Sequence, residues 1–339
     1  MHKEAELKIN AVQGRVVVKV PASTANMGPG FDSLGMALSL YAWVSMAPAE
    51  KTRITLFGDN LDGVPQDKTN LIYEVAQSVF ERAGAEVPEL DIGIRSDIPL
   101  TRGLGSSASA IVGALFAANA LVGSPLSEDE LFQMATAIEK HPDNVGASIF
   151  GGIIAAAWDG ERADYVRIEP PAGMDVLVAI PAFELETKKA RNVLPKTLPM
   201  QDAVFNVTHS SLLTAALFSG RLDLLGRAMR DKMHQPYRAA LIPGMETILK
   251  EATQHGALGA VLSGAGPTLL LLARSGDAAN EGLVAFVRDT MAREGIDVST
   301  RWLEPCLHGP RVRVVGFDDP AYAMEPHQVL ALAGAEVSV

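Results

Sequence analysis

The sequence predicts an α+β protein built from two domains. At 339 residues the chain is long for one domain and comfortable for two. Segments with strand and helix periodicity are mixed without the strict βαβ regularity of a doubly wound sheet. The Pro-rich stretch "RIEPPAGMD", residues 167–175, interrupts this pattern, which restarts beyond it. We therefore expect one domain over 1–168, a second over 172–315 and a C-terminal tail without assigned structure over 316–339.

The first half is expected to mix strands and helices. Alternating residues over 16–20 predict a strand that ends at Pro21, followed by a loop rich in Gly and Pro, "PASTANMGPGFDSLGMAL". "TRITLFG" and "LDIGIRSDIPL" are typical of strands, and "TNLIYEVAQSVFERAG" between them has helical spacing and a final Gly. Helices are expected from Ser106 onward and over "DELFQMATAIEK". "SIFGGIIAAAWDG" is expected to form strand, turn and strand.

The second half repeats this mixture. "VLVAI" predicts a strand, two helical stretches follow between about Asp202 and Arg230, and another helix is expected near 244–255. "GALGAVLSGAGPTLLLLA" indicates two apolar strands around a Gly-rich turn. "AANEGLVAFVRDTMAREG" predicts a helix and "RVRVV" a last strand.

Composition narrows the classes of partner. The chain has 29 basic against 40 acidic side chains and a formal net charge of −11, which repels duplex nucleic acid and anionic membranes. The single Cys306 excludes an internal disulfide and any CxxC motif. The N-terminal "MHKEAELKIN" lacks the apolar core of a signal peptide, and the apolar runs are too short for a membrane span. We therefore expect a cytoplasmic protein that binds neither nucleic acid nor membrane.

The stretch "PLTRGLGSSASAIVGAL", residues 99–115, suits a phosphate. Gly103 and Gly105 allow tight turns, and Ser106 and Ser107 stand where a long helix begins. Free backbone N–H groups and the positive end of the helix dipole converge in such a loop. A Ser N-cap on a packed helix explains the pattern equally well. A Walker loop is excluded because no GKS or GKT follows, and the glycine spacing does not fit a Rossmann fingerprint.

Three other segments carry polar or conformationally special residues. "SGAGPT", residues 263–268, is explained by a hairpin turn. The loop from Pro21 to Gly35 carries Asn26 and Asp32, which can bind a polar ligand, although a solvated turn also explains it. The third segment, "EKHPDNV", is a dense polar cluster that contains Glu139, Lys140, His141, Asp143 and Asn144.

Taken together, these segments resemble the GHMP kinases. "PASTANMGPGFDSLGMAL", "PLTRGLGSSASA" and "LSGAGPT" stand in the order of the three motifs of that family. "EKHPDNVGASIFGG", "ETKKARNVLP" and "RDKMHQPYRAALIP" are similar to its homoserine kinase branch. The resemblance runs from about Val16 to the strand near 315. It implies an N-terminal domain like ribosomal protein S5 domain 2, with a left-handed crossover, a ferredoxin-like C-terminal domain, and an active site between them.

The activity that this resemblance implies is phosphorylation of the L-homoserine side-chain hydroxyl to O-phospho-L-homoserine on the route to threonine. ATP and Mg²⁺ are the implied cofactors, and a homodimer is an open expectation because relatives are often dimers. Two alternatives remain: a GHMP kinase for a mevalonate-like or shikimate-like substrate, and a catalytically silent ATP-binding regulator. A nicotinamide dehydrogenase is opposed by the spacing of the phosphate loop.

On the nucleotide side, the resemblance places the ATP phosphates in the loop and Asn70 near the adenine. Gly264 and Gly266 would let the third motif approach the loop closely. Mg²⁺ would be held by Ser107 and Glu139. Glu139 is chosen because the earlier helical positions used by some relatives hold Gln133 and Ala137. The ATP-binding residues implied are Asn70, Leu100, Thr101, Arg102, Gly103, Leu104, Gly105, Ser106, Ser107, Ala108, Ser109 and Ala110.

On the substrate side, Arg191 and Arg238 match the two arginines that bind the carboxylate, and the planar fork of Arg suits that group. Asp32 matches the acid that meets the ammonium group. The remaining matches to positions near the substrate or the transferred group are Asn26, His141 and Thr187.

For catalysis, Asn144 stands where mevalonate kinase and galactokinase place an Asp. An amide cannot take up a proton at neutral pH, so Asn144 is not a general base. The hypothesis is catalysis by positioning and charge stabilisation, with Asn144 orienting the hydroxyl. The rival hypothesis makes Asp143 the general base.

Overall fold

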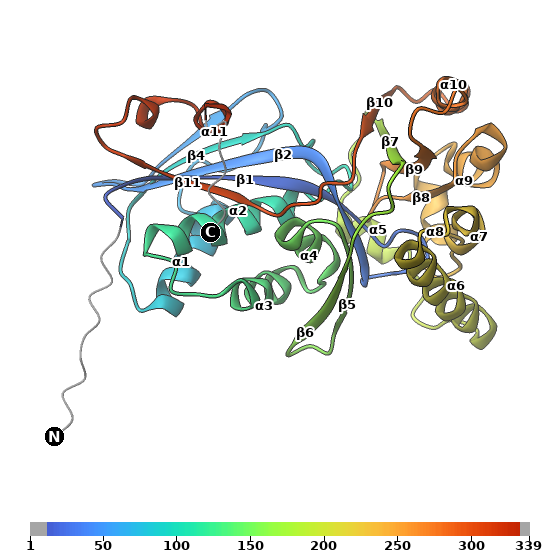
Figure 1. Cartoon of the computed structure of the whole chain (residues 1–339), viewed down its shortest axis with the longest axis horizontal. Helices are drawn as coiled ribbons and strands as arrows, with labels where there is room; N and C mark the ends of the chain where they lie inside the picture. Colours follow the sequence, from blue (N-terminus) through green and yellow to red (C-terminus); the bar gives the residue numbers. More distant parts are fainter. Residues whose placement is uncertain (1–11, 333–339) are drawn as a thin grey trace.

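The computed structural model describes residues 12–332, which form two β-sheets with helices packed on them (Figure 1). The first sheet runs β11-β1-β2-β4-β3, with β5 paired to β2 and β6 to β5; the second runs β10-β7-β9-β8. The strands are β1 (Gly14–Ala25), β2 (Leu34–Pro48), β3 (Arg53–Phe57), β4 (Leu90–Ser96), β5 (Ile153–Trp158), β6 (Ala163–Ile168), β7 (Met174–Pro181), β8 (Gly259–Leu262), β9 (Leu269–Arg274), β10 (Val298–Leu303) and β11 (Arg311–Gly316). The expected α+β class is confirmed.

Helices follow the strands in both halves. In the first half they are α1 (Leu71–Ala83), α2 (Ser106–Leu121), α3 (Glu128–Glu139) and α4 (Asp143–Phe150). In the second half they are α5 (Thr187–Asn192), α6 (Met200–Ser219), α7 (Leu225–Ala228), α8 (Gln235–Arg238), α9 (Met245–Glu251) and α10 (Asn280–Arg293), and near the end α11 (Pro326–Ala331). Short 3₁₀ turns are η1 (Leu222–Leu224), η2 (Ala239–Leu241), η3 (Ala252–His255) and η4 (Pro320–Ala323).

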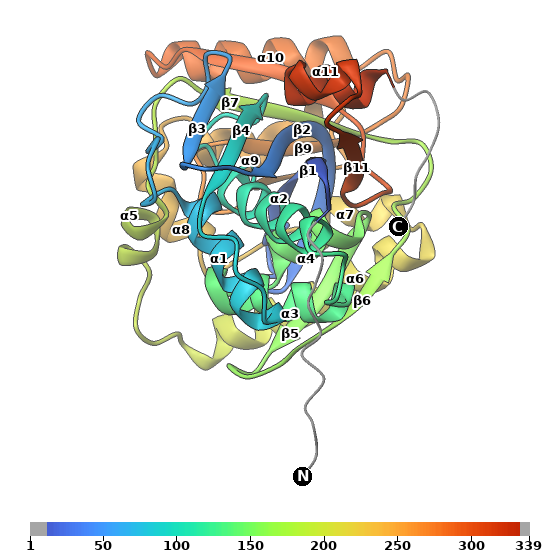
Figure 2. The same cartoon turned by 90° about the vertical axis from the view of Figure 1, so that its left-hand side faces the viewer.

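The first sheet is covered on both faces. Helices α1 to α4 lie on one face, and the segment with η4 and α11 lies on the other (Figure 2). The alternation of β1 reflects this, because Val16 and Val18 face the helical core while Val17 packs against Ala321 and Val329. Residues 317–332, which were expected to be an unassigned tail, therefore supply Ala321 and Val329 to a small hydrophobic cluster on this face of the sheet.

The prediction that the first strand ends at Pro21 is wrong. β1 continues to Ala25, and its pairing with β2 shifts register between Pro21 and Ala22. Such a bulge absorbs the missing N–H of proline without ending the strand. Since β2 begins at Leu34, the loop between the two strands is shorter than expected and spans only residues 26–33.

The strand expected over Ser148–Phe150 is also wrong. These residues form the last turn of α4, and the chain leaves the helix through Gly151 and Gly152, whose φ angles are 65° and 68°. Such angles suit glycine, and the second expected strand then begins at Ile153 as β5. The first residues of α4, Asp143 and Asn144, lie close to loops of both halves, including Asn26 and Gly264.

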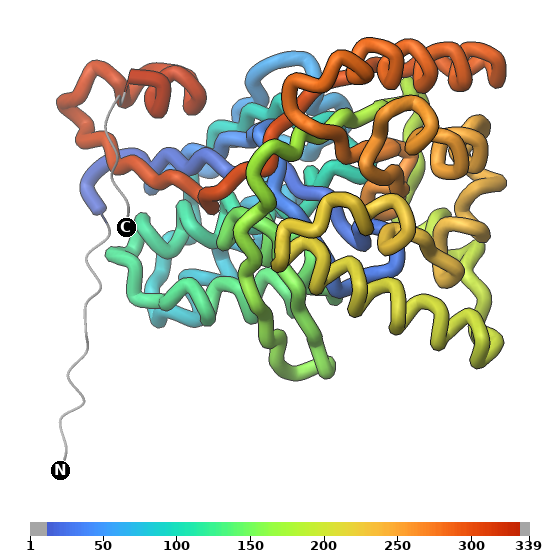
Figure 3. The backbone as a smooth tube through the Cα atoms, turned by 45° about the vertical axis from the view of Figure 1, so that its right-hand side comes forward, coloured from blue at the N-terminus to red at the C-terminus, as the bar shows by residue number. Residues whose placement is uncertain are grey.

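The second sheet is antiparallel in every pair, and its strand order matches the β-α-β-β-α-β arrangement of ferredoxin-like domains. Its core joins Leu177 and Leu271 with Leu283 and Val287 of α10. After β10 the chain returns to the first half, where β11 pairs antiparallel with β1 (Figure 3). The strand expected near 311–315 thus lies in the first sheet.

The two sheets share one hydrophobic core at their junction. Met27 and Leu34 from the β1–β2 turn pack in the same cluster as Val176 and Leu270 of the second sheet. The polar loops of both halves meet beside this cluster. Within residues 12–332, none of the helices has the length and the apolar character that crossing a bilayer requires.

Candidate active site

A polar cavity of about 160 Å³ lies where the loops of the two halves meet. Most of the residues expected in the site line it, namely Asn26, Asp32, Thr101, Gly103, Gly105, Ser106, Ser107, Ala108, Glu139, His141, Asp143, Asn144, Thr187, Arg191, Arg238, Gly264 and Gly266. Residues this far apart in sequence meet only through the packing of both domains. The expected nucleotide residues that do not line it are Asn70, Leu100, Arg102, Leu104, Ser109 and Ala110.

The phosphate loop presents an uncapped helix end to this cavity. Gly105 is the N-cap of α2, with φ 70° and no side-chain cap. Within residues 12–332 the hydroxyls of Ser106 and Ser107 donate no hydrogen bond, while Ser109 Oγ donates to Ser106 O at 3.0 Å. The alternative of a Ser N-cap is therefore not observed. Free N–H groups and the helix dipole remain available to an anion.

The "SGAGPT" turn is hydrogen-bonded to the phosphate loop. Ser263 Oγ lies 2.6 Å from Gly103 O and 2.8 Å from Thr24 Oγ1, and Thr268 N–H donates to Arg102 O at 3.2 Å. A side chain at Gly103 would collide with the backbone of Ser263. The turn is thus both a hairpin connection and a support that fixes the conformation of the phosphate loop.

Two of the expected ATP ligands have other partners. Asn70 is the N-cap of α1; it accepts from Ile72 N–H at 2.9 Å and donates to Pro65 O at 2.6 Å. Arg102 bonds the Leu100 and Ala182 carbonyls and lies 3.5 Å from Glu184. The structure does not bring either side chain into the cavity lining.

The first turn of α4 supplies a buried polar cluster. The Asp143 side chain is 1% exposed, and its Oδ1 accepts from the backbone N–H of Asn144 and pairs with His141 Nδ1, both at 2.8 Å. His141 Nε2 lies 3.5 Å from Glu139 Oε2. Burial alone would lower the pKa of His141, but the bond to Asp143 and the charges of both carboxylates raise it to about 8. His141 is therefore largely protonated at neutral pH.

Asn144 is oriented by a serine of β1. Ser23 Oγ donates to Asn144 Oδ1 at 3.0 Å, and Ser148 Oγ donates to Ser23 Oγ at 3.2 Å. With its carbonyl oxygen engaged, the amide group of Asn144 has its N–H bonds left for a ligand. Its chemistry at the cavity is therefore that of a hydrogen-bond donor.

Glu139 fits the role of a ligand for a divalent cation. Its Oε1 is buried and has no hydrogen-bond partner within the described part of the chain. Glu139 and Ser107 both line the cavity. Gln133 is used otherwise, since its amide bonds both the N–H and the carbonyl of Ala163. No group of three or more His, Cys, Asp or Glu side chains suited to a metal occurs in residues 12–332. Mg²⁺ bound mainly through substrate phosphates needs only one or two protein oxygens.

Two arginines and one aspartate form a charged wall of the same cavity that the phosphate loop lines. Arg191 makes two hydrogen bonds to the Asp32 carboxylate, at 2.8 and 3.0 Å. Arg238 is 2% exposed and donates to the carbonyls of Ala190 and Gly264. Burial, assisted by the charge of Arg191, lowers the pKa of Arg238 to about 10, so that it stays charged at neutral pH.

Two residues that hold Arg238 in place, His234 and Asp231, were not expected in the site from the sequence. His234 is fully buried; its Nδ1 lies 3.1 Å from Arg238 Nη1, and its Nε2 lies 2.8 Å from Gly28 O. Asp231 accepts four hydrogen bonds, from the side chain of Asn206 and from three backbone N–H groups at 233–235. Both residues lie in "RDKMHQPYRAALIP", a segment that indicated the region but not these roles.

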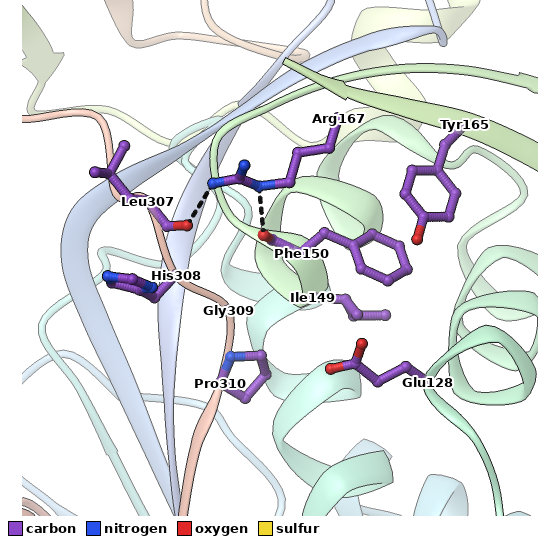
Figure 4. A pocket seen from close by; sticks show the side chains of 9 residues that line it. All are labelled: Glu128, Ile149, Phe150, Tyr165, Arg167, Leu307, His308, Gly309 and Pro310. Carbon is purple, nitrogen blue, oxygen red and sulfur yellow. Dashed lines mark hydrogen bonds between the residues drawn. The ribbon is translucent and has the colours of Figure 1, made fainter. Parts of the chain in front are cut away.

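A second cavity, of about 370 Å³, lies at the other end of α4 and is larger than the first (Figure 4). Arg167 bridges the carbonyls of Phe150 and Leu307 at its edge, and Glu128 and Tyr165 also line it. None of the residues expected in the active site lines this cavity. Size alone therefore does not identify the site, whereas converging charges and backbone donors do.

Comparisons with known proteins agree with this geometry. Residues 70–152 match the GHMP kinases N terminal domain and 213–293 the GHMP kinases C terminal domain. A homoserine kinase of Moorella thermoacetica is 43% identical to this chain, over 86% of this chain and 98% of its own length. A homoserine kinase of Crocosphaera subtropica is 46% identical, over 76% of this chain and 85% of its own length. A crystal structure of a homoserine kinase from Cytophaga hutchinsonii has a TM-score of 0.81 and 30% identity, covering 91% of this chain and all of the other. The L. major mevalonate kinase, at 19% identity and TM-score 0.65, shares the fold.

The His234–Arg238 contact predicts an acid-sensitive fold. Arg238 can only donate, so His234 Nδ1 must accept, which requires a neutral imidazole. Burial, reinforced by the charge of Arg238, lowers the pKa of His234 in the native state. The unfolded chain binds this proton as the pH falls through 6.5 and the native chain does not, so the contribution of His234 to stability should fall with pH, by at most about 1.4 kcal/mol per pH unit. Urea denaturation at pH 7.0 and 5.5 measures this.

A His234→Gln variant provides the control, because glutamine can accept from Arg238 and donate to Gly28 O without titrating. Its stability should change less between the two pH values than that of the wild type. His141 acts with the opposite sign in part of this range, since its raised pKa contributes stability that is complete below 6.5 and lost as the pH rises through 8. Both proteins keep His141, so the difference between their pH slopes reports His234 alone. Equal pH slopes for the two proteins would contradict the assignment.

Proposed function

Because the chain belongs to the homoserine kinases of the GHMP kinase family, we propose that its interdomain cavity transfers the γ-phosphoryl group of ATP to the side-chain hydroxyl of L-homoserine. The product would be O-phospho-L-homoserine, an intermediate toward threonine. One structural observation supports this proposal independently of family membership. An uncapped helix N-terminus, suited to phosphate, lines the same cavity as an acid and two arginines, which suit an amino acid.

The ATP phosphates are assigned to the N-terminus of α2 and the loop before it. The supporting features are the left-handed conformations of Gly103 and Gly105 and the two unengaged hydroxyls that follow. Adenine contacts are proposed less directly for Asn70, since the cap of α1 already uses its amide. Arg102 contributes charge near the loop, although its guanidinium is engaged with carbonyl groups.

Glu139 and Ser107 are proposed to hold Mg²⁺. The unpartnered Oε1 of Glu139 supports this choice, and a hydroxyl is an ordinary oxygen ligand for the ion. When bound, Mg²⁺ would neutralise charge on the phosphate oxygens and orient them for transfer. Lys140 continues past the helix end in a left-handed conformation, with φ 68°, and its ammonium group lies 5.9 Å from the Trp158 ring.

The two ends of the amino acid are assigned to opposite charges. Arg191 and Arg238 would bind the carboxylate, and Asp32 the ammonium group. Asn26 supports Asp32 by accepting its backbone N–H at 3.0 Å, and Thr187 and His141 line the cavity nearby. A mevalonate-like or shikimate-like substrate has no ammonium group and would leave Asp32 without a partner. A silent regulator would not need this paired arrangement.

Catalysis is proposed to rest on positioning. The Asn144 amide donates to the homoserine hydroxyl oxygen and directs it at the γ-phosphorus. The new P–O bond forms as the bond to ADP breaks, and the hydroxyl proton passes late to a phosphate oxygen. Asp143 is disfavoured as a base because its Oδ1 already binds two donors and its side chain is buried.

The assignment predicts turnover with L-homoserine in an ATP-coupled assay and little turnover with mevalonate, shikimate or galactose. The reason is that only homoserine supplies both the cation and the anion that the wall of the cavity recognises. Rates measured at equal concentrations of each acceptor, with an ADP-detecting coupled system, provide the test. Preferential turnover of one of the other acceptors would refute the substrate, and no turnover with any acceptor would favour a regulator.

Substitutions at adjacent positions separate the two mechanisms. Asn144→Ala should lower kcat by roughly a hundredfold with little change in KM for ATP, because orientation of the nucleophile is lost. Asp143→Asn keeps an acceptor for the Asn144 N–H and should lower kcat far less. Thermal unfolding of each variant controls for folding. A loss of several orders of magnitude in Asp143→Asn, with Asn144→Ala nearly unaffected, would establish Asp143 as the base.

A homodimer formed through α6 is also proposed. Apolar side chains are exposed along one side of this helix; Met200 is 78%, Val204 53%, Val207 67% and Phe218 77% exposed. Their successive spacings of four, three and eleven residues place them on one side of the helix, and Asp202 is the only acid or base of fixed charge in Met200–Ser219. An antiparallel second copy would place Met200 opposite Phe218, so the stripe is complementary to itself.

Sedimentation or light scattering tests this interface. The wild type should behave as a dimer of 35.9 kDa chains, and Val207→Glu should give a monomer because it buries a charge at the centre of the stripe. Val166→Glu is a matched control, since Val166 is 61% exposed on β6 and does not belong to the stripe on α6. A monomeric wild type, or a Val207→Glu protein that stays dimeric, would refute the proposal.

A further inference from the structure

Resting on the proposed function, we propose that Asp32 and Arg191 form an ion-pair latch that the two charges of the substrate must replace together. The latch makes the site selective for zwitterions. A molecule with only a carboxylate, or only an ammonium group, would release one member of the pair and leave the other without a partner.

In the structure, Arg191 and Asp32 are bonded directly to each other. Arg191 Nη1 and Nη2 lie 3.0 and 2.8 Å from the two oxygens of Asp32, which is the two-pronged arrangement that arginine forms with a carboxylate. The Arg191 and Asp32 side chains are 39% and 33% exposed, so water and ligands reach them. Each group thus occupies the position on its partner where a substrate charge would bind.

Both halves of the latch are anchored through their backbones. Asp32 has a φ angle of 53°, unusual for this residue, and its N–H donates to Asn26 Oδ1. Arg191 follows Ala190, whose carbonyl accepts from the buried Arg238 Nε at 3.1 Å. Opening the pair therefore requires only side-chain motion, because the backbone on each side has a separate attachment.

Arg238 differs from Arg191 in being ready to bind. Its Nε and Nη1 are engaged with protein groups, but its Nη2 donates no hydrogen bond within residues 12–332. Both guanidinium groups lie 5.5 Å from the centre of the Phe31 ring. An incoming carboxylate thus finds one arginine free and the other already bound to Asp32.

The number of ion pairs explains the selectivity. A zwitterion converts the single Asp32–Arg191 pair into two pairs, one at each end of the ligand. A hydroxy acid takes Arg191 but leaves the Asp32 carboxylate unpaired, and an amino alcohol does the reverse. A charge that loses its partner in a partly desolvated site is unfavourable. The affinity of each ligand with a single charge is therefore lowered by the cost of breaking the Asp32–Arg191 pair.

This model predicts that weakening the latch improves the binding of the wrong ligands. Asp32→Asn should weaken L-homoserine but tighten 4-hydroxybutanoate by roughly fivefold to tenfold, the size expected for a partly exposed ion pair. Arg191→Gln should tighten 3-aminopropan-1-ol by a similar factor. Calorimetric or NMR titration of each analogue, in the absence of ATP, measures these affinities without requiring turnover.

Two variants at the start of α5, one at its N-cap and one in its first turn, control for changes in net charge. Lys188→Gln changes the net charge as Arg191→Gln does, and Glu186→Gln matches Asp32→Asn, but neither residue belongs to the pair. Both should leave the analogue affinities within about twofold of wild type, because both side chains are exposed and, within residues 12–332, neither is hydrogen-bonded to Asp32 or Arg191. Thermal unfolding of all four variants controls for folding.

The outcomes separate the latch from the function on which it rests. If Asp32→Asn and Arg191→Gln do not tighten their analogues, or if the α5 controls reproduce the gains, the latch is refuted even where the wild type phosphorylates homoserine. If the wild type phosphorylates no homoserine, the proposed function is refuted. The titrations then still report whether the pair opposes ligands that carry one charge.

Discussion

One backbone carbonyl, that of Gly264, holds both sides of the substrate wall. It accepts from Asn26 Nδ2 and from Arg238 Nη1, each at 2.9 Å. Asn26 in turn fixes the backbone of Asp32, and Arg238 holds the carbonyl of Ala190 next to Arg191. The acid from the first half and the arginines from the second are therefore positioned by a single turn. The same turn bonds the phosphate loop through Ser263 Oγ, so the geometry of both substrates depends on it.

This dependence explains why the cavity contains so many buried polar groups. Asp143, His234 and Arg238 each lose water on folding. Asp143 finds its partners within the first half and Arg238 within the second, whereas His234 bonds Gly28 O across the two halves. Asp143 holds His141 and the N-terminus of α4, while His234 connects Arg238 to the turn after Asn26 through Gly28 O. A partly assembled cavity would leave His234 Nε2 without Gly28 O and Asn26 Nδ2 without Gly264 O, which couples formation of the site to docking of the domains.

Local sequence patterns predicted most elements but not how proline and glycine behave in context. The alternation over 16–20 identified β1, yet a bulge carries the strand past Pro21 because pairing with β2 continues on the other side. The short segment Ser148–Phe150 is compatible with a strand or a helix. It forms the end of α4 because that helix begins earlier in the chain, at Asp143. The resemblance to a family brought most site residues together. It could not show that the α1 cap uses Asn70, or that His234 and Asp231 support Arg238, since such roles depend on three-dimensional neighbours.

The return of the chain to the first sheet as β11 has a mechanical consequence. Two separate segments cross between the halves, residues 169–173 before β7 and residues 304–310 after β10. The second crossing is itself paired to β2 through Ser39, whose N–H donates to Glu304 O, and through a bridge between Leu38 and Pro305. Two bodies joined at two points can rotate easily only about the line through those points. Any rotation of the two halves relative to one another is thereby restrained to the axis through these two crossings.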